Sequence, residues 1–391
     1  MKVETLYAYV SRGLLMSERS RDGRRSTFSA ADVERLALRG RPRRSTRGPA
    51  IDVSIRTSLT SIDGRTLRFR GHDAIGLVGR TAFEQVAELL WNGRLPSNVP
   101  HWGDGRVLPF RPPDAAMLDR LRLAVALDAC CHEHGATLDA TGGADLLHAG
   151  PTLIATMVGA LPVRSRRPTP LLRTDDGRAT RGSTAGRLAV RLVAGRPSSA
   201  LVAALDAALV LLADHEMAAS TFAARVAASV RADAHAVVSA GMGPIAGALH
   251  GQASRSVRSL LDDAEATSVV AAVTRAADRP GPLPGTGHGL YPYGDPRAPV
   301  LMERVRVSGG RPERMHTVDA VVAEIERRGL GRPNVDMALG ALGHVWAMAP
   351  DAGEALFAVA RTVGWLAHGA EEWEHRPLRF RTRATYVGVA P

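Results

Sequence analysis

The sequence contains little cysteine, and it has no apolar run long enough to cross a membrane. Cys130 and Cys131 are the only cysteines among 391 residues. Neighbouring cysteines seldom pair, which excludes a disulfide scaffold and favours a reducing compartment. The longest mainly apolar stretch, residues 146–163, contains Pro151 and falls short of the ~20 residues of a membrane span. No charged segment followed by an apolar one opens the chain, so we expect no signal peptide and a cytoplasmic location.

Lysine is nearly absent as well, and the positive charge is concentrated at one end. The chain has 50 Lys and Arg against 39 Asp and Glu, a net charge of +11, and Lys2 is its only lysine. Residues 1–50 hold twelve basic and five acidic residues, a net of +7, which leaves +4 for the remainder. Such a basic head is typical of a nucleic-acid contact, and equally of a solvated tail.

A helix, a basic turn and a second helix are predicted within this head. Residues 4–15 place apolar side chains at helical spacing, and residues 29–36 begin with a serine suited to a helix N-cap. Between them, residues 19–25 hold the tight-turn dipeptide Asp22–Gly23 among arginines. This order resembles the DNA-binding head of MerR-like regulators, in which the first of these helices enters the major groove and the hairpin contacts phosphates. DNA is therefore a candidate partner, although the head is partial because such regulators carry a further helix before these.

From residue 53 onward helical periodicity dominates, and alternating strand patterns are scarce. Residues 83–91 place apolar side chains on one helical face. Residues 199–230 form the clearest long helical segment, with a leucine stripe that continues to His215. A histidine on an apolar face is by itself usually a core residue. The pattern predicts an all-α body.

The clearest candidates for catalytic residues lie in three segments interrupted by glycines, residues 241–254, 285–297 and 331–336. The first holds His250 between a flexible loop and a helical run, and the second holds His288 after the glycines of a GTGH sequence. The third places Asp336 in the first turn of a helix, where the helix dipole favours the charged carboxylate and would let it serve as a base. Taken alone, Asp336 is better interpreted as a helix-capping carboxylate. No strand precedes the GTG sequence, which argues against a phosphate-binding loop.

Several stretches of the body match the citrate synthase family, which includes citrate and 2-methylcitrate synthases. They are IDGRTLRFRGHD (62–73), FEQVAELLWNGRLP (83–96), DHEMAASTFAARV (214–226), GALHG (247–251), GTGH…DPR (285–297), NVD (334–336), ARTVGWLAH (360–368) and RTRATYVG (381–388). The order and spacing of these stretches are those of the family over residues 53–388, and motifs in register are stronger evidence than any one of them. The body is therefore identified as a member of this family.

The resemblance implies an all-α fold of two domains with a substrate cleft between them. Residues 53–245 and 342–391 would form the large domain and residues 246–341 the small domain. A partial MerR-like, winged-helix-like head (1–38) and a basic linker (39–52) would precede them. In the family the small domain closes over oxaloacetate, which creates the acyl-CoA site and excludes water. The family also acts as a homodimer in which the C-terminal arm of one subunit completes its partner's site.

The resemblance also implies roles for individual residues. Asp336 matches the base that deprotonates the methyl group of the acyl thioester, His250 the group bound to the thioester oxygen, and His288 the donor that polarises the ketone of oxaloacetate. The remaining oxaloacetate ligands would be His215, Arg297, Arg361 and Arg381. The guanidinium groups of the three arginines suit the carboxylates of oxaloacetate. Arg381 would serve the partner subunit. No cofactor is expected, because acetyl-CoA is a substrate.

Two features depart from the expected pattern. Bacterial members usually read Arg-Val-Tyr-Lys after the histidine, with basic residues near the CoA phosphates, whereas this chain reads Gly289-Leu-Tyr-Pro292. Ser254 replaces an asparagine after His250.

The Cys-Cys-His-Glu-His run at residues 130–134 lies in a helical stretch where adjacent side chains diverge, so we expect no metal site there.

The leading hypothesis is a cytoplasmic acyltransferase of the citrate synthase type, which condenses acetyl-CoA with oxaloacetate to give citrate and CoA. One alternative is a 2-methylcitrate synthase that uses propionyl-CoA, because a hydrophobic pocket distinguishes one methylene by only ~1–3 kcal/mol. The other is a DNA-binding regulator whose citrate-synthase-like body senses a carboxylate or an acyl-CoA. The complete set of catalytic residue types favours the enzyme, whereas Gly289, Pro292 and the basic head favour the regulator.

Overall fold

The computed structural model describes residues 54–388 with short gaps, together with two strands of the head. The gaps are residues 111, 113, 132–141, 167–169, 176–178, 181, 248–249 and 383–384. The chain divides into two compact units, Met1–Ile55 and Arg56–Pro391.

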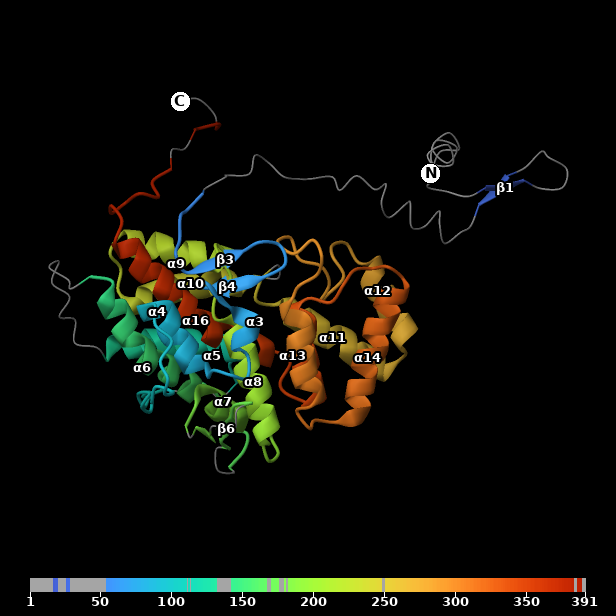
Figure 1. Ribbon diagram of the computed structural model, residues 1–391, viewed down its shortest axis with the longest axis horizontal. Coiled ribbons are helices and arrows are strands. Elements are labelled where there is room, and N and C mark those ends of the chain that lie inside the picture. Colours follow the sequence, from blue (N-terminus) through green and yellow to red (C-terminus); the bar gives the residue numbers. More distant parts are fainter. Residues whose placement is uncertain are drawn as a thin grey trace. The chain divides into compact units, whose positions relative to one another are not determined.

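In the first unit, strands β1 (Ser17–Arg19) and β2 (Ser26–Phe28) pair in antiparallel fashion, with Ser17 opposite Phe28 (Figure 1). These strands lie on either side of the predicted Asp22–Gly23 turn, in the order expected for a hairpin. The turn itself, the two helices predicted beside it and the basic linker at 39–52 lie outside the described residues. The MerR-like head therefore stays a prediction.

The second unit is mostly helical, which confirms the predicted all-α class. One group of helices comprises α3 (Ala74–Leu77), α4 (Phe83–Asn92), α5 (Met117–Cys130), α6 (Ala144–Ala160), α7 (Thr184–Leu192), α8 (Ser199–Leu212), α9 (Ala219–Ser229), α10 (Ala234–Ile245) and α16 (Ala352–Trp373). A second group comprises α11 (Ala253–Ala266), α12 (Val269–Asp278), α13 (Arg297–Arg306), α14 (Pro312–Arg327) and α15 (Val335–Val345). Figure 1 shows α11 to α14, drawn in yellow-brown to orange, on one side of the first group. None of the described helices is both long and apolar enough to span a membrane.

Short antiparallel strands complete the second unit. They are β3 (Thr60–Ile62), β4 (Leu67–Phe69) and β5 (His72–Asp73) in one sheet, and β6 (Leu172–Arg173) and β7 (Ala179–Thr180) in another. In the first sheet Thr60 lies opposite Phe69, and the turn between β3 and β4 contains Gly64, whose positive φ of 84° favours glycine. The predicted boundary between the large and small domains at residue 341 falls inside α15, and the domain limits stay a prediction.

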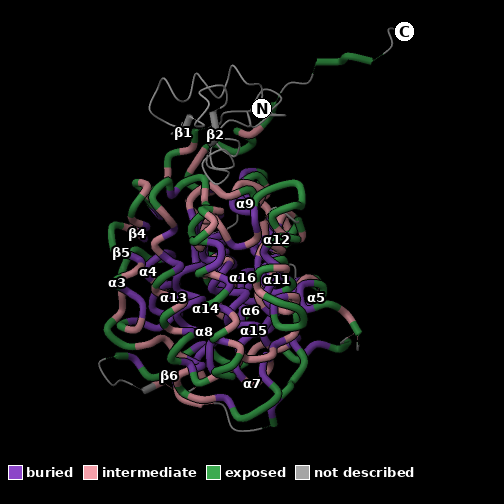
Figure 2. Tube along the Cα trace, turned by 90° about the vertical axis from the view of Figure 1, so that its right-hand side faces the viewer, coloured by how far each residue is buried: buried purple, intermediate pink, exposed green. Residues whose placement is uncertain are grey.

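The core of the unit is built around α16, which is buried along most of its length (Figure 2). This helix contacts α4, α5, α6, α8, α9 and α10. Gly364 allows its close approach to the end of α8, because a Cβ atom there would lie 2.4 Å from Asp214 Oδ1 and 2.6 Å from the carbonyl oxygen of Ala213. The Gly364 amide instead donates to that carbonyl at 3.0 Å. This contact fixes Arg361, one helical turn earlier, beside the chain that leads to His215.

The long helix expected at residues 199–230 is interrupted. α8 ends at Leu212, α9 begins at Ala219, and His215 lies in the loop between them rather than on a helical stripe. The reason is competition for the backbone, because α16 captures the carbonyls at the end of α8. Arg361 Nε donates to the Leu212 carbonyl at 2.8 Å, and Glu216 adopts a positive φ of 53° as the chain turns.

Candidate active site

Six of the seven predicted site residues line one cavity of about 460 Å³ in the second unit. They are His215, His250, His288, Arg297, Asp336 and Arg361. The structure thus brings together side chains that are separated by up to 146 residues, from the α8–α9 loop, the loops before α11 and α13, the first turns of α13 and α15, and α16. Arg381 is exposed on the segment that follows α16 and does not line this cavity.

Arg297 is the first residue of α13 and is held by a buried carboxylate. Its Nε and Nη2 atoms donate to Asp295 at 2.9 and 2.8 Å. Burial alone would lower the pKa of Arg297, but the carboxylate of Asp295 outweighs it and the pKa is raised. Asp295 also accepts from the amide of Val335 at 3.0 Å, which ties the start of α13 to the start of α15. The sequence reasoning gave Asp295 no role, although the Asp-Pro-Arg motif contained it.

Arg361 supplies a second buried cation. In addition to its bond to the Leu212 carbonyl, its guanidinium carbon lies 4.6 Å from the ring centroid of Phe357. Burial lowers the pKa of Arg361 to about 10, which leaves the guanidinium charged at neutral pH. Two fixed guanidinium groups in one cavity suit a ligand with two carboxylates.

Asp336 is placed by the capping residue of its helix. Asn334 accepts through its side chain from the amides of Asp336 and Met337 at 3.0 and 3.3 Å, and its Nδ2 donates to the Gly287 carbonyl at 2.8 Å. One asparagine therefore fixes both the first turn of α15 and the loop that carries His288.

The pKa of Asp336 shifts in the direction opposite to the one that the helix dipole favours. Burial raises its pKa to about 6, although the neighbouring Arg297 and Arg361 act in the opposite direction. Loss of hydration thus outweighs the favourable dipole and the two cations. A carboxylate with this pKa is mostly ionised at neutral pH and is a stronger base than a solvated aspartate, as proton abstraction requires.

His250 is a neutral imidazole. Burial, and then the charge of Arg361, lower its pKa to about 4. Its Nε2 lies 2.8 Å from Ser220 Oγ, and its ring meets Phe357 edge-on with centroids 5.4 Å apart. If the serine hydroxyl donates to Nε2, the single ring proton lies on Nδ1 and is available to a ligand.

His288 and His215 form a cluster with Tyr291, a residue to which the sequence reasoning gave no role. The His288 ring centroid lies 5.0 Å from those of His215 and Tyr291, and His215 Nε2 lies 2.9 Å from the Tyr291 hydroxyl. Burial is the main cause that lowers the pKa of both histidines. The amide of Leu290 donates to His288 Nδ1 at 3.2 Å, so the proton of the neutral ring belongs on Nε2. His288 therefore presents a hydrogen-bond donor.

Asp214, the residue before His215, lies in a buried network of hydrogen bonds. Asp214 accepts from Thr60 Oγ1 at 2.5 Å and lies 3.1 Å from His368 Nε2. Burial would raise the pKa of Asp214, but His368 and nearby donors outweigh it and the pKa is lowered. On its far side, His368 contacts Arg225 at 2.9 Å. This network supports the loop that carries His215.

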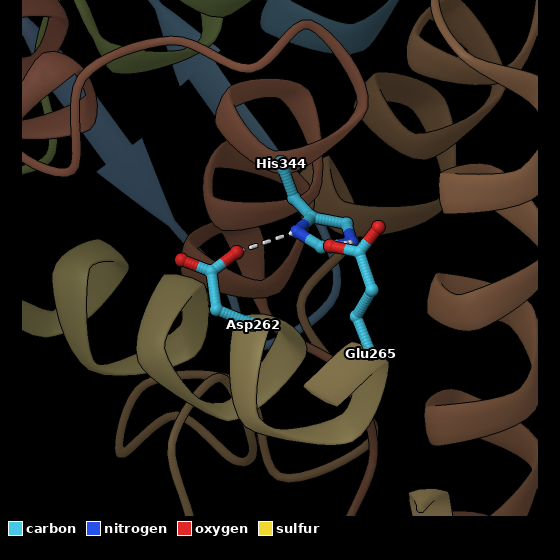
Figure 3. Close-up of side chains that lie close together, drawn as sticks. All are labelled: Asp262, Glu265 and His344. Atoms are coloured by element: carbon cyan, nitrogen blue, oxygen red, sulfur yellow. Dashed lines mark hydrogen bonds and ion pairs between the residues drawn. The ribbon is translucent and has the colours of Figure 1, made fainter. Parts of the chain in front are cut away.

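Asp262, Glu265 and His344 form a cluster of potential metal ligands away from this cavity (Figure 3). His344 Nδ1 lies 2.8 Å from Asp262 Oδ1, and its Nε2 lies 3.8 Å from Glu265 Oε2. Each carboxylate also accepts from a guanidinium, Arg258 on Asp262 at 2.8 Å and Arg314 on Glu265 at 3.1 Å. Because both carboxylates already face a cation, the cluster is an ion-pair network joining α11, α14 and α15 rather than a site suited to a metal ion. The other metal candidate of the sequence, residues 130–134, lies mostly outside the described residues.

Comparison with known proteins identifies relatives over most of the chain. Residues 52–383 match the family model described as citrate synthase, C-terminal domain. The chain is 28% identical to 2-methylcitrate synthase 1 of Corynebacterium glutamicum, over 86% of this chain and 93% of the relative. It is 30% identical to a citrate synthase of Haloferax volcanii, over 85% of this chain and 93% of the relative.

Solved structures share the fold. The crystal structure of citrate synthase from Thermotoga maritima gives a TM-score of 0.67 at 24% identity, covering 89% of this chain and 96% of that chain. Citrate synthase from Thermoplasma acidophilum, solved as a ternary complex with carboxymethyl coenzyme A and oxaloacetate, gives a TM-score of 0.68 at 24% identity, covering 87% of this chain and 95% of that chain. Since the family model spans most of the chain and the helical fold agrees with it, this protein belongs to the citrate synthase family.

Proposed function

We propose that this protein is an acyltransferase that condenses acetyl-CoA with oxaloacetate and releases citrate and CoA. The observation that carries the proposal is the convergence of a basic carboxylate, two neutral histidines and two buried cations on one cavity: Asp336, His250, His288, Arg297 and Arg361. Family membership supports the reaction class, because the relatives include proteins named citrate synthase and 2-methylcitrate synthase.

The first step in the proposed reaction removes a proton from the acyl methyl group. Asp336 accepts this proton, and its pKa of about 6 brings it closer to the basicity that the step needs. Negative charge then develops on the thioester oxygen, where the Nδ1 proton of His250 would donate a hydrogen bond. Ser220 supports this arrangement through its contact with His250 Nε2. A neutral donor stabilises an enolate without needing to lose a positive charge afterwards.

The second step forms the carbon–carbon bond. Arg297 and Arg361 would bind the two carboxylates of oxaloacetate, and His215 would add a further polar contact. The Nε2 proton of His288 would point at the ketone oxygen, polarise it and pass to it as the enolate carbon attacks the ketone carbon. Water then cleaves the thioester of the condensation product, which gives citrate and the free thiol of CoA.

Release of the CoA thiol tests this proposal. The purified protein, oxaloacetate and acetyl-CoA should yield free thiol, and Asp336→Asn should abolish the release while oxaloacetate binding, measured by calorimetry, persists. Asp278→Asn, an exposed carboxylate at the end of α12, is the matched control and should retain activity. A folded protein that binds oxaloacetate but releases no thiol from either acetyl-CoA or propionyl-CoA would overturn the proposal.

Propionyl-CoA is the second donor to test, because one relative with 28% identity is named 2-methylcitrate synthase. The ratio of kcat/KM for the two donors decides between a citrate and a 2-methylcitrate synthase. A preference for propionyl-CoA would assign the second activity to the same site and the same residues.

We also propose that the enzyme acts in the cytoplasm as a homodimer in which Arg381 completes the partner's site. The position of Arg381 on an exposed C-terminal segment, away from the cavity of its own chain, supports this.

A regulatory role in DNA binding is the alternative favoured by the antiparallel strands on either side of the basic turn. Salt-dependent retention of duplex DNA by the full chain, measured by gel shift, tests that role.

A further inference from the structure

The loop from His288 to Tyr293 leads from the cavity to the surface. His288 and Leu290 both line the cavity, and Leu290 is 42% exposed. Tyr293, three residues later, is 61% exposed. When the thioester of an acyl-CoA lies beside Asp336, the remainder of the CoA molecule must extend out of the cavity. The exposed Leu290 provides an apolar edge along which its pantetheine chain can pass.

Two arginines from distant parts of the chain meet this loop at Tyr293. The guanidinium carbon of Arg65, in the turn between β3 and β4, lies 4.5 Å from the centroid of the Tyr293 ring. Arg332, which precedes α15, donates through Nη1 to the Tyr293 carbonyl at 2.8 Å. The β3–β4 turn contacts the loop closely, since a Cβ atom on Gly64 would lie 3.7 Å from Pro292 Cδ. Both cations are therefore held in defined positions next to the loop.

The charges of these two arginines are not neutralised by an ion pair with any residue that the structure describes. The acidic residue of the same turn, Asp63, is bound instead to Arg68 at 3.0 Å. The two arginines in the last turn of the neighbouring helix α13 are paired as well, Arg304 with Asp175 and Arg306 with Asp319. Arg65 and Arg332 are both exposed, so an anion can reach them from solvent. Two positioned, unpaired guanidinium groups form an anion-binding surface.

We propose that Arg65 and Arg332, held by Tyr293, bind the phosphate groups of the acyl-CoA donor. This inference rests on the proposed function, because CoA is the polyphosphate that the proposed reaction brings to the cavity mouth. Guanidinium groups bind phosphate oxygens through paired, charge-assisted hydrogen bonds. The inference also accounts for Gly289 and Pro292, where the family resemblance led us to expect cations. In this chain the cations come from the β3–β4 turn and from the loop before α15.

Comparison of donors with and without phosphates tests the proposal. Arg65→Gln and Arg332→Gln should each raise the KM for acetyl-CoA by about fivefold, the effect of ~1 kcal/mol expected for an exposed charge pair, and the double variant by about twenty-five-fold. The kcat, the KM for oxaloacetate and the KM for acetyl-pantetheine, which lacks the phosphates, should stay unchanged. Arg68→Gln removes an arginine of the same hairpin that is already paired with Asp63, and it should change none of these values.

Calorimetric binding of CoA and of pantetheine gives a second readout that does not depend on turnover. The wild type should bind CoA more tightly than pantetheine, and the double variant should lose most of this difference. Equal binding of CoA and pantetheine by the wild type, or unchanged CoA binding by the double variant, would overturn the inference. So would an equal rise in KM for both donors, since that result indicates a disturbed loop, or an effect of Arg68→Gln as large as that of its neighbours. If the wild type binds CoA through these arginines but releases no thiol, the proposed reaction fails and the phosphate site stands.

Discussion

Replacement of Asp336 by asparagine should stabilise the protein at neutral pH, even though it removes the proposed base. The pKa of Asp336 rises from 3.8 to about 6 on folding because the carboxylate is buried. Between these values the native state binds more protons than the unfolded state, so the free energy of unfolding falls as the pH rises. The difference between the two pKa values, at ~1.36 kcal/mol per pH unit, corresponds to a loss of about 3 kcal/mol between pH 3 and pH 8. Asparagine does not titrate and escapes this loss.

Urea denaturation of the wild type and Asp336→Asn, at several pH values and one protein concentration, measures this effect. The stability of the variant relative to the wild type should increase by about 3 kcal/mol from pH 3 to pH 8 and then level off. Asp278→Asn controls for the general loss of a negative charge and should show no such increase. A difference between Asp336→Asn and the wild type that is independent of pH would refute the reasoning, because it would mean that folding does not raise the pKa of Asp336. In the wild type, kcat should also fall below pH 6, as the base becomes protonated.

Three further predictions concern the support of the site and its assembly. Ser220→Ala should lower kcat about tenfold in the thiol-release assay, because His250 loses the hydrogen bond at Nε2 that keeps its ring proton on Nδ1. An unchanged kcat would contradict this role of Ser220. Gly364→Ala should lower the free energy of unfolding by about 1–3 kcal/mol in urea, whereas Gly159→Ala, which meets no atom within 4 Å, should not. Arg381→Gln and Asp336→Asn, each inactive alone, should recover activity when unfolded together and refolded as mixed dimers. No recovery, despite dimers seen by light scattering, would argue against a shared site.

The sequence predicted the residues of the cavity better than it predicted how they are held. Motifs in register placed His215, His288 and Asp336 in one family pattern, and the structure brings them to one cavity. The contacts of Tyr291 with His215 and of Ser220 with His250 depend on how distant segments pack, which a motif does not encode. The family pattern Arg-Val-Tyr-Lys that follows the histidine does contain a tyrosine at the position of Tyr291. That tyrosine was the one sign in the sequence that this residue belongs to the site.

Local rules failed where tertiary contacts compete with them. The periodicity of residues 199–230 predicts one helix, yet Arg361 and Gly364 bind the last carbonyls of α8 and end it. The helix dipole favours an ionised Asp336, yet burial raises its pKa. The end of α8 is decided by residues of α16, far along the chain, and the pKa of Asp336 by its burial, so only the folded structure reveals either.

The cap of α15 has a consequence for the timing of the reaction. Through its bonds to the Asp336 amide and the Gly287 carbonyl, Asn334 joins the proposed base to the loop that carries His288, the proposed ketone donor. His250 is bound instead to Ser220 on α9. A displacement of α11–α15 relative to α9 and α16 would separate the proposed base, Asp336, from His250, the proposed donor to the thioester oxygen. In the proposed reaction, deprotonation of the thioester would then require the two groups of helices to come together, and an acyl thioester bound to only one of them would keep its proton.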